Sequence, residues 1–391
     1  MRHSISPSRC CFSPMGLPGI LALAVLLALA GACSRNEPTA DEAIFTPEAF
    51  ATTDVPLSQS DQVALLADER VACVVDSYET RVHCVDAEGA VVGVFGRAGE
   101  GPGEFGGSGN PGNLGLVRGE EGTVGVYDGA LGRFTVFEPS GTYVSDVPTP
   151  FLDPLRSFGT VLSGVVWRGW IADSLMTRYD VNIATGEVVR EEASPSGRWG
   201  VTCGEGEVID GIPDRASGWV FVACGDRLVF AGDNGDATVV PVPTHLPDER
   251  DVARLEERLL AVRGSLHPEV TSRALQGSSE GTYRSFVDES LEGYRGKPKP
   301  YSLGEEHRLF DAANRYWIAT QRDTHEWSYL DVYENAEYVG SVRVRDRLRA
   351  FDLLGSTLVV LVERQAGPDD ADGVPDRELD WYDIGELPFG R

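Results

Sequence analysis

Short runs of β-branched and aromatic residues, separated by polar turns, repeat along the chain at a regular spacing. Residues 71–96 contain three such runs, and residues 123–147 repeat them in the same order. Within several of these runs apolar and polar residues alternate, as in a strand that buries one face. A glycine follows the second run of each copy, where a tight turn favours a positive φ. Each copy therefore predicts three antiparallel strands joined in sequence.

The two copies are offset by 52 positions, and their polar residues coincide. The matching pairs are Asp76 and Asp128, Arg81 and Arg133, Asp86 and Glu138, and Gly89 and Gly141. A third copy follows, with Asp173, Arg178 and Gly186 at the same internal spacing. Small sheets that repeat about every 40 to 50 residues are typical of the blades of a β-propeller.

The repeats and the later apolar runs predict an all-β fold, a six-bladed β-propeller over residues 44–391. Blades are expected at about 63–96, 114–147, 162–190, 201–242, 307–344 and 348–384. The last blade lacks a fourth strand before the chain ends, and an open sheet edge needs a partner. We expect residues 51–57 to supply that outer strand and to join the two ends of the fold.

Residues 245–297 break the strand pattern and have helical periodicity instead. Four apolar residues share one helical face: Val252, Leu255, Leu259 and Val262. Pro247 and Asp248 suit the start of this helix, Gly264 suits its end, and a second short helix is expected at 283–291. The segment is predicted to be a helical insertion between blades four and five that lies over one face of the propeller.

The charge of the chain limits its partners. It carries 61 Asp and Glu against 34 Lys and Arg, a net charge of −27. Such acidity repels phosphate backbones and anionic lipid surfaces, so nucleic acid is not expected to be a partner. The acidity favours a soluble surface; binding of cationic partners or metal ions is the alternative.

Residues 1–32 have the features of a targeting segment. Arg2 and Arg9 give it a basic start, and residues 20–32 are apolar over a length shorter than the roughly 20 residues that span a bilayer. Small residues then precede Cys33. The segment resembles a bacterial lipoprotein signal peptide, which implies cleavage before Cys33 and lipidation of this cysteine.

Residues 33–43 are polar and are expected to form a flexible tether. The resemblance implies export and lipid anchoring in the cell envelope. The residue after the cysteine is Ser34, not aspartate, which indicates the outer membrane if the host has one. Ordinary secretion with cleavage near Ala32 is the alternative.

Four cysteines follow Cys33: Cys73, Cys84, Cys203 and Cys224. If Asp76 lies opposite Arg81, the same register places Cys73 opposite Cys84. Opposed strand residues have Cβ atoms about 4.5–5.5 Å apart, which is compatible with a disulfide. Cys203 and Cys224 are the second candidate pair, because an even count in an oxidising compartment favours disulfides. Four buried free thiols are the alternative.

The segment FGRAGEGPGEF, at 95–105, precedes a loop, an apolar run, an aspartate and an arginine. This order resembles the NHL-repeat family. With the signal segment, it also resembles uncharacterised six-bladed propeller lipoproteins of bacteria. NHL-type propellers include protein-binding scaffolds, peptidoglycan-linked sensors and a few enzymes, so the resemblance implies a fold rather than a reaction.

The recurring acid–arginine pairs are expected to be structural, because a carboxylate and a guanidinium that flank one hairpin can bind each other and the loop amides. Ligand binding is the alternative for these residues, which are Asp76, Arg81, Asp128, Arg133, Asp173 and Arg178. Their recurrence in successive repeats favours the structural role.

Four other residues are candidates to face a ligand: Arg97, Glu100, Glu104 and Trp327. The first three lie in the glycine-rich linker between blades one and two. This linker contains G-x-G-x-x-G at 101–106, but the residues after it cannot start the helix that a dinucleotide site requires. Trp327 is predicted to lie in an irregular loop, whereas most other tryptophans fall in predicted strands.

An acidic loop at 369–376 resembles a calcium-binding loop, with Asp370, Asp372 and Asp376 as candidate ligands. The Glu that an EF-hand has six positions after its glycine is replaced by Leu379. An exposed acidic loop without a metal is the alternative, and no cofactor is required by the sequence.

No catalytic residue is identified, because no histidine pair has metal-ligand spacing and no G-x-S-x-G segment is present. We therefore expect a monomeric binding or scaffold module for a protein, a peptide or an envelope glycan. A metal-dependent hydrolase or lyase with a cation in the central channel is the alternative. Convergent carboxylates with strongly shifted pKa values at the channel mouth would favour the enzyme.

Overall fold

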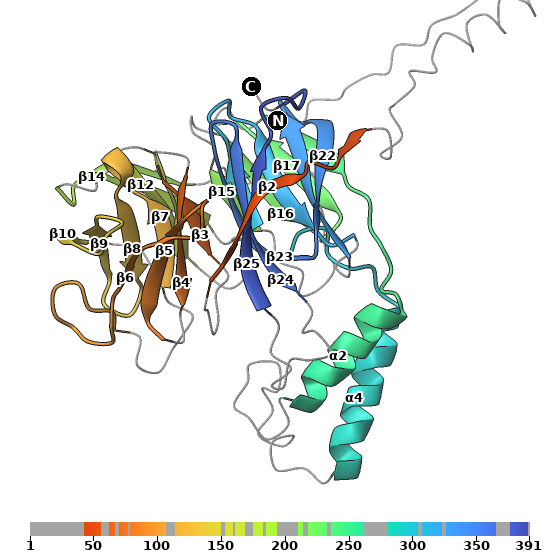
Figure 1. Ribbon diagram of the computed structural model, residues 1–391. Coiled ribbons are helices and arrows are strands. Elements are labelled where there is room, and N and C mark those ends of the chain that lie inside the picture. Colours follow the sequence, from red (N-terminus) through yellow and green to blue (C-terminus); the bar gives the residue numbers. More distant parts are fainter. Residues whose placement is uncertain are drawn as a thin grey trace, which may run out of the picture. The chain divides into compact units, whose positions relative to one another are not determined.

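A computed structural model describes most of the chain after the targeting segment (Figure 1). The described residues are 43–55, 62–66, 70–76, 79–106, 114–149, 153–158, 161–168, 175–182, 185–193, 210–213, 218–232, 236–261, 280–303, 307–322, 326–364 and 376–389. Within these ranges no helix combines the length and the apolar character needed to cross a membrane. The predicted signal segment, Cys33 and all but the last residue of the tether lie outside the described residues.

The described strands form six sheets, numbered here in chain order. Sheet one contains β3 (Val63–Leu65), β4 (Val71–Asp76), β5 (Arg81–Asp86) and β6 (Val91–Phe95). Sheet two contains β7 (Leu114–Arg118), β8 (Val124–Asp128), β9 (Arg133–Phe137) and β10 (Tyr143–Pro148). Sheet three contains β11 (Asp153–Phe158), β12 (Val161–Arg168), β13 (Leu175–Asn182) and β14 (Val188–Ala193).

The second half of the chain forms the other three sheets. Sheet four contains β15 (Asp210–Pro213), β16 (Trp219–Ala223), β17 (Arg227–Ala231) and β18 (Ala237–Pro241). Sheet five contains β19 (Arg308–Phe310), β20 (Tyr316–Thr320), β21 (Trp327–Glu334), β22 (Glu337–Arg345) and the N-terminal β1 (Ile44–Phe45). Sheet six contains β23 (Arg347–Leu354), β24 (Thr357–Arg364), β25 (Asp376–Asp383) and the N-terminal β2 (Ala49–Asp54). The described residues are therefore all-β, as predicted, apart from two α-helices and a short 3₁₀ turn (η2, Glu120–Gly122).

The N-terminal segment closes the last sheet, and this prediction is confirmed. β2 pairs antiparallel with β25 and supplies the fourth strand of sheet six. The segment was expected to form one strand, but it forms two, because β1 pairs parallel with β22 in sheet five. Pro47 lies between the two strands and cannot donate to a ladder, which separates them.

The local turn chemistry follows the sequence prediction. Gly89 and Gly141 have φ values of 88° and 92°, in the region that favours glycine. Their amides donate to Asp86 O and Glu138 O, at 3.1 and 2.8 Å. These turns join the last two strands of sheets one and two in the predicted register.

The first strands of sheets five, six, one, two and three lie next to one another in that order. His307 Nε2, just before β19, donates to the carbonyl of Arg349 in β23 at 2.7 Å. The amide of Leu65 in β3 donates to Asp352 Oδ2 in β23 at 2.8 Å. β3 contacts β7, and β7 contacts β11. The first strands therefore follow the order β19, β23, β3, β7, β11, and a shared apolar cluster links sheets four and five.

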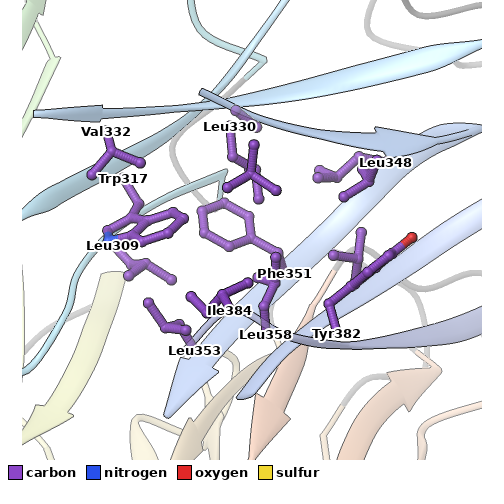
Figure 2. Packing of buried hydrophobic residues seen from close by; sticks show 14 of the residues in the cluster. Leu309, Trp317, Leu330, Val332, Leu348, Phe351, Leu353, Leu358, Tyr382 and Ile384 are labelled. Carbon is purple, nitrogen blue, oxygen red and sulfur yellow. The ribbon is translucent and has the colours of Figure 1, made fainter. Parts of the chain in front are cut away.

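The first and last strands of the sheets differ in how deeply they are buried. β3 and β19 are buried along their whole length, whereas β6 and β18 are mostly exposed. A large apolar cluster lies between sheets five and six, with Trp317, Phe351 and Tyr382 among its members (Figure 2). The core is thus built mostly from inner strands, although β22 also contributes Val342 and Val344 to the cluster between sheets five and six.

The predicted insertion contains two helices, α2 (Glu249–Ala261) and α4 (Glu280–Arg295), which pack against each other (Figure 1). Asp248 caps α2, because its Oδ1 accepts the amides of Arg250 and Asp251 at 2.8 and 2.9 Å. Val252 and Leu259 of the predicted stripe are buried against Tyr283 and other residues of α4. α4 is longer than predicted, and the position of the pair over one face of a propeller stays a prediction.

Cys73 and Cys84 form a disulfide, with Cα atoms 4.0 Å apart in directly opposed ladder positions. The predicted register of β4 and β5 is thereby confirmed. Cys224 is also disulfide-bonded, and its predicted partner Cys203 lies outside the described residues.

Replacing both Cys73 and Cys84 with alanine is expected to lower the free energy of unfolding by about 2–4 kcal/mol, since the bridge restricts the unfolded chain. Urea unfolding at neutral pH, without a reductant, measures the difference in stability from the chain that keeps both cysteines. Mass analysis after thiol alkylation provides the control, because the unmodified chain should show no reactive thiol at these two positions. Equal stability of the two proteins would contradict a stabilising bridge.

Candidate functional site

The repeated aspartates Asp76 and Asp128 bind backbone amides of nearby loops. Asp76 Oδ1 accepts the amide of Glu79 at 2.9 Å. Asp128 Oδ1 accepts the amides of Ala130 and Leu131, and its Oδ2 accepts the amide of Gly106 at 2.6 Å. Both aspartates are fully buried and therefore fix their hairpins from inside.

The arginines of these repeats lie directly opposite the aspartates in the ladders. Arg133 nevertheless binds the glycine-rich linker, donating to the carbonyls of Glu100 and Gly101 at 3.2 and 2.7 Å and also to that of Glu104. In sheet five an arginine and an aspartate that flank one hairpin do bind each other, since Arg315 Nε donates to Asp311 Oδ2 at 2.7 Å.

The third repeat differs from the first two. Arg178 lies in the middle of β13, opposite Val165, and not at the start of a strand. Its Nε donates to Asp180 Oδ1 at 2.8 Å in a buried ion pair. Asp173 lies outside the described residues. β13 is longer than the corresponding strands β5 and β9, so Arg178 lies further from its hairpin than Arg81 and Arg133 do. The three repeats have the same spacing in the sequence, but their arginines do not occupy equivalent positions in the sheets.

Two of the linker residues that were candidates to face a ligand bind each other or other residues of the linker. Arg97 Nε donates to Glu104 Oε1 at 2.7 Å, and Glu104 Oε2 accepts the amide of Gly101. The Gly101 amide and then Arg97 lower the pKa of the Glu104 carboxyl group. Glu100 is exposed, and its carbonyl accepts from Arg133. These contacts favour a structural role for Arg97 and Glu104.

The predicted position of Trp327 is wrong. It is the first residue of β21, it is half-buried, and it pairs with Arg345 of β22. The guanidinium of Arg343 lies 4.2 Å from the centre of its ring. Trp327 is therefore part of a regular ladder, and its ring contacts an arginine of the neighbouring strand. The irregular sequence that precedes Trp327 did not indicate this position.

The candidate calcium ligands are described only in part. Asp376 is an exposed residue at the start of β25, opposite Arg364, and Asp370 and Asp372 lie outside the described residues. Within the described residues, no group of three or more His, Cys, Asp or Glu side chains is placed to hold a metal ion.

A cluster of arginines that the sequence analysis missed lies on sheet six. Arg347 in β23, Glu363 in β24 and Arg377 in β25 occupy one row across the three strands. Arg347 Nη1 lies 3.0 Å from Glu363 Oε1, and Arg377 Nη2 lies 3.7 Å from Oε2. Arg349 Nε approaches the same carboxylate at 3.8 Å. Three guanidinium groups thus share one carboxylate that is only 15% exposed.

Helix α2 adds a fourth positive charge to this group. Burial lowers the pKa of Arg347, and the nearby charges of Arg349 and Arg254 lower it further, while Glu363 raises it. We name Arg254, Arg347, Arg349, Arg377 and Glu363 the arginine cluster. It lies at the start of β23, where His307 also binds the carbonyl of Arg349.

The opposite end of β23 is closed by an ion pair that joins three sheets. Arg118 Nη2 of β7 donates to Asp352 Oδ2 of β23 at 2.8 Å and to the carbonyl of Leu353 at 3.0 Å. Arg118 Nε donates to the carbonyl of Leu65 in β3. These buried contacts make this end a structural junction, so the arginine cluster is the stronger candidate for ligand binding.

Sheet five contains a buried polar network whose members bind one another. The carboxylate of Asp331 accepts from Tyr301, Arg322 and Ser341. Tyr301 OH also lies 2.8 Å from Tyr333 OH. Burial and the charge of Asp331 raise the pKa values of both tyrosines, so their hydroxyls stay protonated. Hydrogen bonds among the members of the network favour a structural role, although Arg322 Nε is buried without a hydrogen-bond partner among the described residues.

Lys299 connects the helix pair to this network. Its Nζ lies 2.8 Å from Asp251 Oδ2 at the start of α2 and donates to the carbonyl of Arg322 at 3.1 Å. Both side chains of the Lys299–Asp251 pair are less than a tenth exposed. The insertion is therefore fixed to sheet five at its base.

His83 is buried in β5, and within the described residues its Nε2 has no hydrogen-bond partner. Burial lowers its pKa from the usual 6.5, more than Asp76 and Glu79 raise it. Below pH 6.5 the unfolded state therefore binds more protons than the folded state. The contribution of neutral His83 to stability is complete above pH 6.5 and is lost progressively as the pH falls below that value.

Replacing His83 with leucine is expected to reduce the loss of stability between pH 7.5 and 5.5. Urea unfolding of both proteins at each pH measures this loss. The carboxylates of the chain titrate in both proteins, so the comparison isolates the histidine. Equal losses in the two proteins would show that His83 does not titrate differently on folding.

Comparisons with known proteins assign no family to the chain. No known family model matches it, and no curated protein sequence is significantly similar. A DUF4221-family structure from Bacteroides vulgatus has a TM-score of 0.41 and 10% identity, over 86% of this chain and 97% of that one.

Two further solved structures are similar over most of the chain. BamB from Moraxella catarrhalis has a TM-score of 0.34 and 13% identity, over 83% of this chain and 85% of that one. Virginiamycin B lyase from Staphylococcus aureus, solved as an inactive variant with quinupristin, has a TM-score of 0.34 and 9% identity, over 83% and 82%. At TM-scores below 0.5, none of these likenesses gives this chain an activity or a ligand.

Proposed function

We propose that the chain is a six-bladed β-propeller that acts as a binding module outside the cytoplasm. The order of first strands supports this architecture, because the first strands of neighbouring blades surround the central channel of a propeller. Sheets four, five, six, one, two and three follow one another through the contacts described above. The pairing of β2 with β25 joins the two ends of the chain, as a closed ring requires.

The arginine cluster is the observation that carries the binding function. It places half-buried charged side chains on rigid strands next to the start of β23. Sites built on rigid strands hold side chains in place before a ligand arrives, which reduces the entropy lost on binding. The proposed ligand is a protein, a peptide or an envelope glycan, and the proposed active form is a monomer.

Export and lipid anchoring through Cys33 belong to the same proposal. The signal segment supports them, and the disulfide between Cys73 and Cys84 supports an oxidising compartment. The full chain produced in a diderm bacterium should be found in the outer-membrane fraction with a lipid-modified N-terminal cysteine, measured by mass spectrometry. A Cys33→Ala variant should lose the lipid; an unprocessed or cytoplasmic wild type would overturn the anchoring.

The binding function is tested with the full chain purified in mild detergent. We expect it to retain a component of separated envelope protein, peptide or glycan fractions, identified by mass spectrometry. An Arg347→Gln/Arg349→Gln variant should retain less of the same component. The matched control is Arg70→Gln, since Arg70 is 67% exposed and pairs with Glu88 at the surface. Equal retention by all three proteins, or none by any, would overturn the proposal.

A further inference from the structure

We propose that the outer edge of β6, in sheet one, binds an extended segment of another protein by strand addition. The segment carries an aliphatic residue followed by an aromatic one, with basic residues at its ends. The edge is made of other residues than the arginine cluster, and the inference does not depend on the binding function proposed for that cluster. It gives the protein a second place of contact, on the rim of sheet one.

The outer edge of β6 is open and apolar. β6 is the last strand of sheet one, and within the described residues no strand pairs with its outer side. Val91, Val92 and Val94 are 63%, 37% and 46% exposed. An open strand edge with apolar side chains is a surface to which another strand can add, since its backbone offers hydrogen bonds and its side chains offer contact area.

Sheet five has an edge of the same construction. The ladder between β21 and β22 shifts by one residue at Val339, which precedes Gly340. The ladder between β5 and β6 shifts in the same way at Val92, which precedes Gly93. A β-bulge of this kind leaves its extra residue unpaired and bends the strand. The residues that follow the glycine therefore occupy equivalent positions on the two edges.

The edge of sheet five shows what such a position accepts. β1 pairs in parallel with residues 341–342, directly after Gly340. Its Phe45 and the bulge residue Val339 pack against the same apolar cluster. The equivalent positions of β6 are 94–95, where no described strand lies. The molecule thus contains one occupied and one open copy of the edge, and the occupant is the aliphatic–aromatic pair of β1.

The open edge is held in place by sheet two. A Cβ atom on Gly93 would clash with the carbonyl oxygen of Pro139, in the turn between β9 and β10, so only glycine allows this close approach. The rings of Phe95 and Phe137 lie 4.6 Å apart, centre to centre. Since residues on either side of it face sheet two, Val94 faces the other way. An edge that is ordered before a partner arrives loses less entropy on binding.

Two carboxylates beside β6 favour a basic partner. Asp86 accepts a backbone amide at 2.7 Å, and Glu138 accepts a serine hydroxyl at 3.3 Å. In the part of the chain that the structure describes, neither carboxylate forms an ion pair, whereas Glu88 is paired with Arg70. Copies of a chain with a net charge of −27 repel one another, so the occupant is a segment of a different protein with basic ends.

Fluorescence anisotropy with the full chain in mild detergent tests the inference. The probe is a fluorescein-labelled peptide, KTVAIFTVK, which places the sequence Ala-Ile-Phe-Thr around β1 in a segment with basic ends. A copy with N-methyl groups on the isoleucine and phenylalanine amides cannot donate to a ladder, and a copy with glutamate ends reverses the charge. We expect saturable binding of the probe, no binding of the methylated copy and weaker binding of the glutamate-ended copy.

Variants of the chain locate the binding. Val94→Asp should weaken binding of the probe about tenfold, because the edge loses an apolar contact while the new charge attracts the basic peptide and so cannot explain a loss. Leu246→Asp makes a similar change in a loop, at a residue that is 64% exposed, and should bind normally. The Arg347→Gln/Arg349→Gln variant should also bind normally. If Val94→Asp fails to fold by circular dichroism, Val92→Asp takes its place.

Binding that is lost on N-methylation and is weakened only by the change in β6 supports the inference. Absence of saturable binding, equal binding of the methylated copy, or equal binding by Val94→Asp and the unchanged chain overturns it. The last result includes displacement of β1 from β22 by the probe, which does not involve Val94. Equal weakening in Leu246→Asp also overturns it, and equal binding of the glutamate-ended copy overturns the basic character of the partner. None of these results bears on the arginine cluster.

Discussion

Replacing Asp352 with alanine is expected to lower the free energy of unfolding by about 3–5 kcal/mol, the usual cost of removing one partner from a buried ion pair. The carboxylate accepts from Arg118 of sheet two and from the amide of Leu65 in sheet one. The substitution leaves the guanidinium of Arg118, which is 23% exposed, without its acid. Three sheets lose a common contact at the place where their first strands meet.

Chemical denaturation followed by tryptophan fluorescence measures this loss. Asp383→Ala is the matched control, because Asp383 is exposed at the end of β25 and accepts the amide of its near neighbour Gly385, at 2.9 Å. We expect the control to lose less than about 1 kcal/mol. Similar losses for Asp352→Ala and the control would contradict a junction between sheets six, one and two.

The second large effect is expected for Trp381 in β25. Its side chain is fully buried, and its Nε1 donates to Thr53 Oγ1 of β2 at 3.3 Å. It lies opposite Ala51 in the ladder that joins the N-terminal segment to sheet six. Replacing it with alanine should cost about 3–5 kcal/mol, as in other truncations of buried aromatic residues.

Trp327→Ala provides a matched control for the same chemical change. Trp327 is half-buried and stacks with Arg343, so its truncation should cost about 1 kcal/mol. Protease digestion supplies a second readout, because loss of the β2–β25 contacts should expose residues 44–54 to cleavage in Trp381→Ala only. Equal stability and equal cleavage in the two variants would contradict closure by the N-terminal strand.

The signal that could have revealed the arginine cluster is present in the sequence. Residues 342–349 read VRVRDRLR, four arginines at every second position in a chain of net charge −27. Alternation of this kind predicts a strand with basic residues on one face. The turn at Asp346 divides the run between β22 and β23, so the arginines belong to two sheets and only some reach Glu363. The pattern alone could not separate them.

The sequence by itself determined the features that depend on short spacing. The hairpin of Cys73 and Cys84, the glycine turns after β5 and β9, and the cap of α2 at Asp248 all involve residues close together in the chain. Turn geometry and ladder register fix such contacts locally, so the pattern of residues is enough to predict them.

Only the tertiary structure decided which distant residues meet. Arg254, Arg347 and Glu363 lie on a helix and two strands, and their approach depends on how the helix pair is attached through Lys299 and Asp251. The addition of β1 to β22 depends in the same way on packing of Phe45 against Phe389. Side-chain packing between elements has no period in the sequence, which is why the pattern predicted the sheets but not the candidate site.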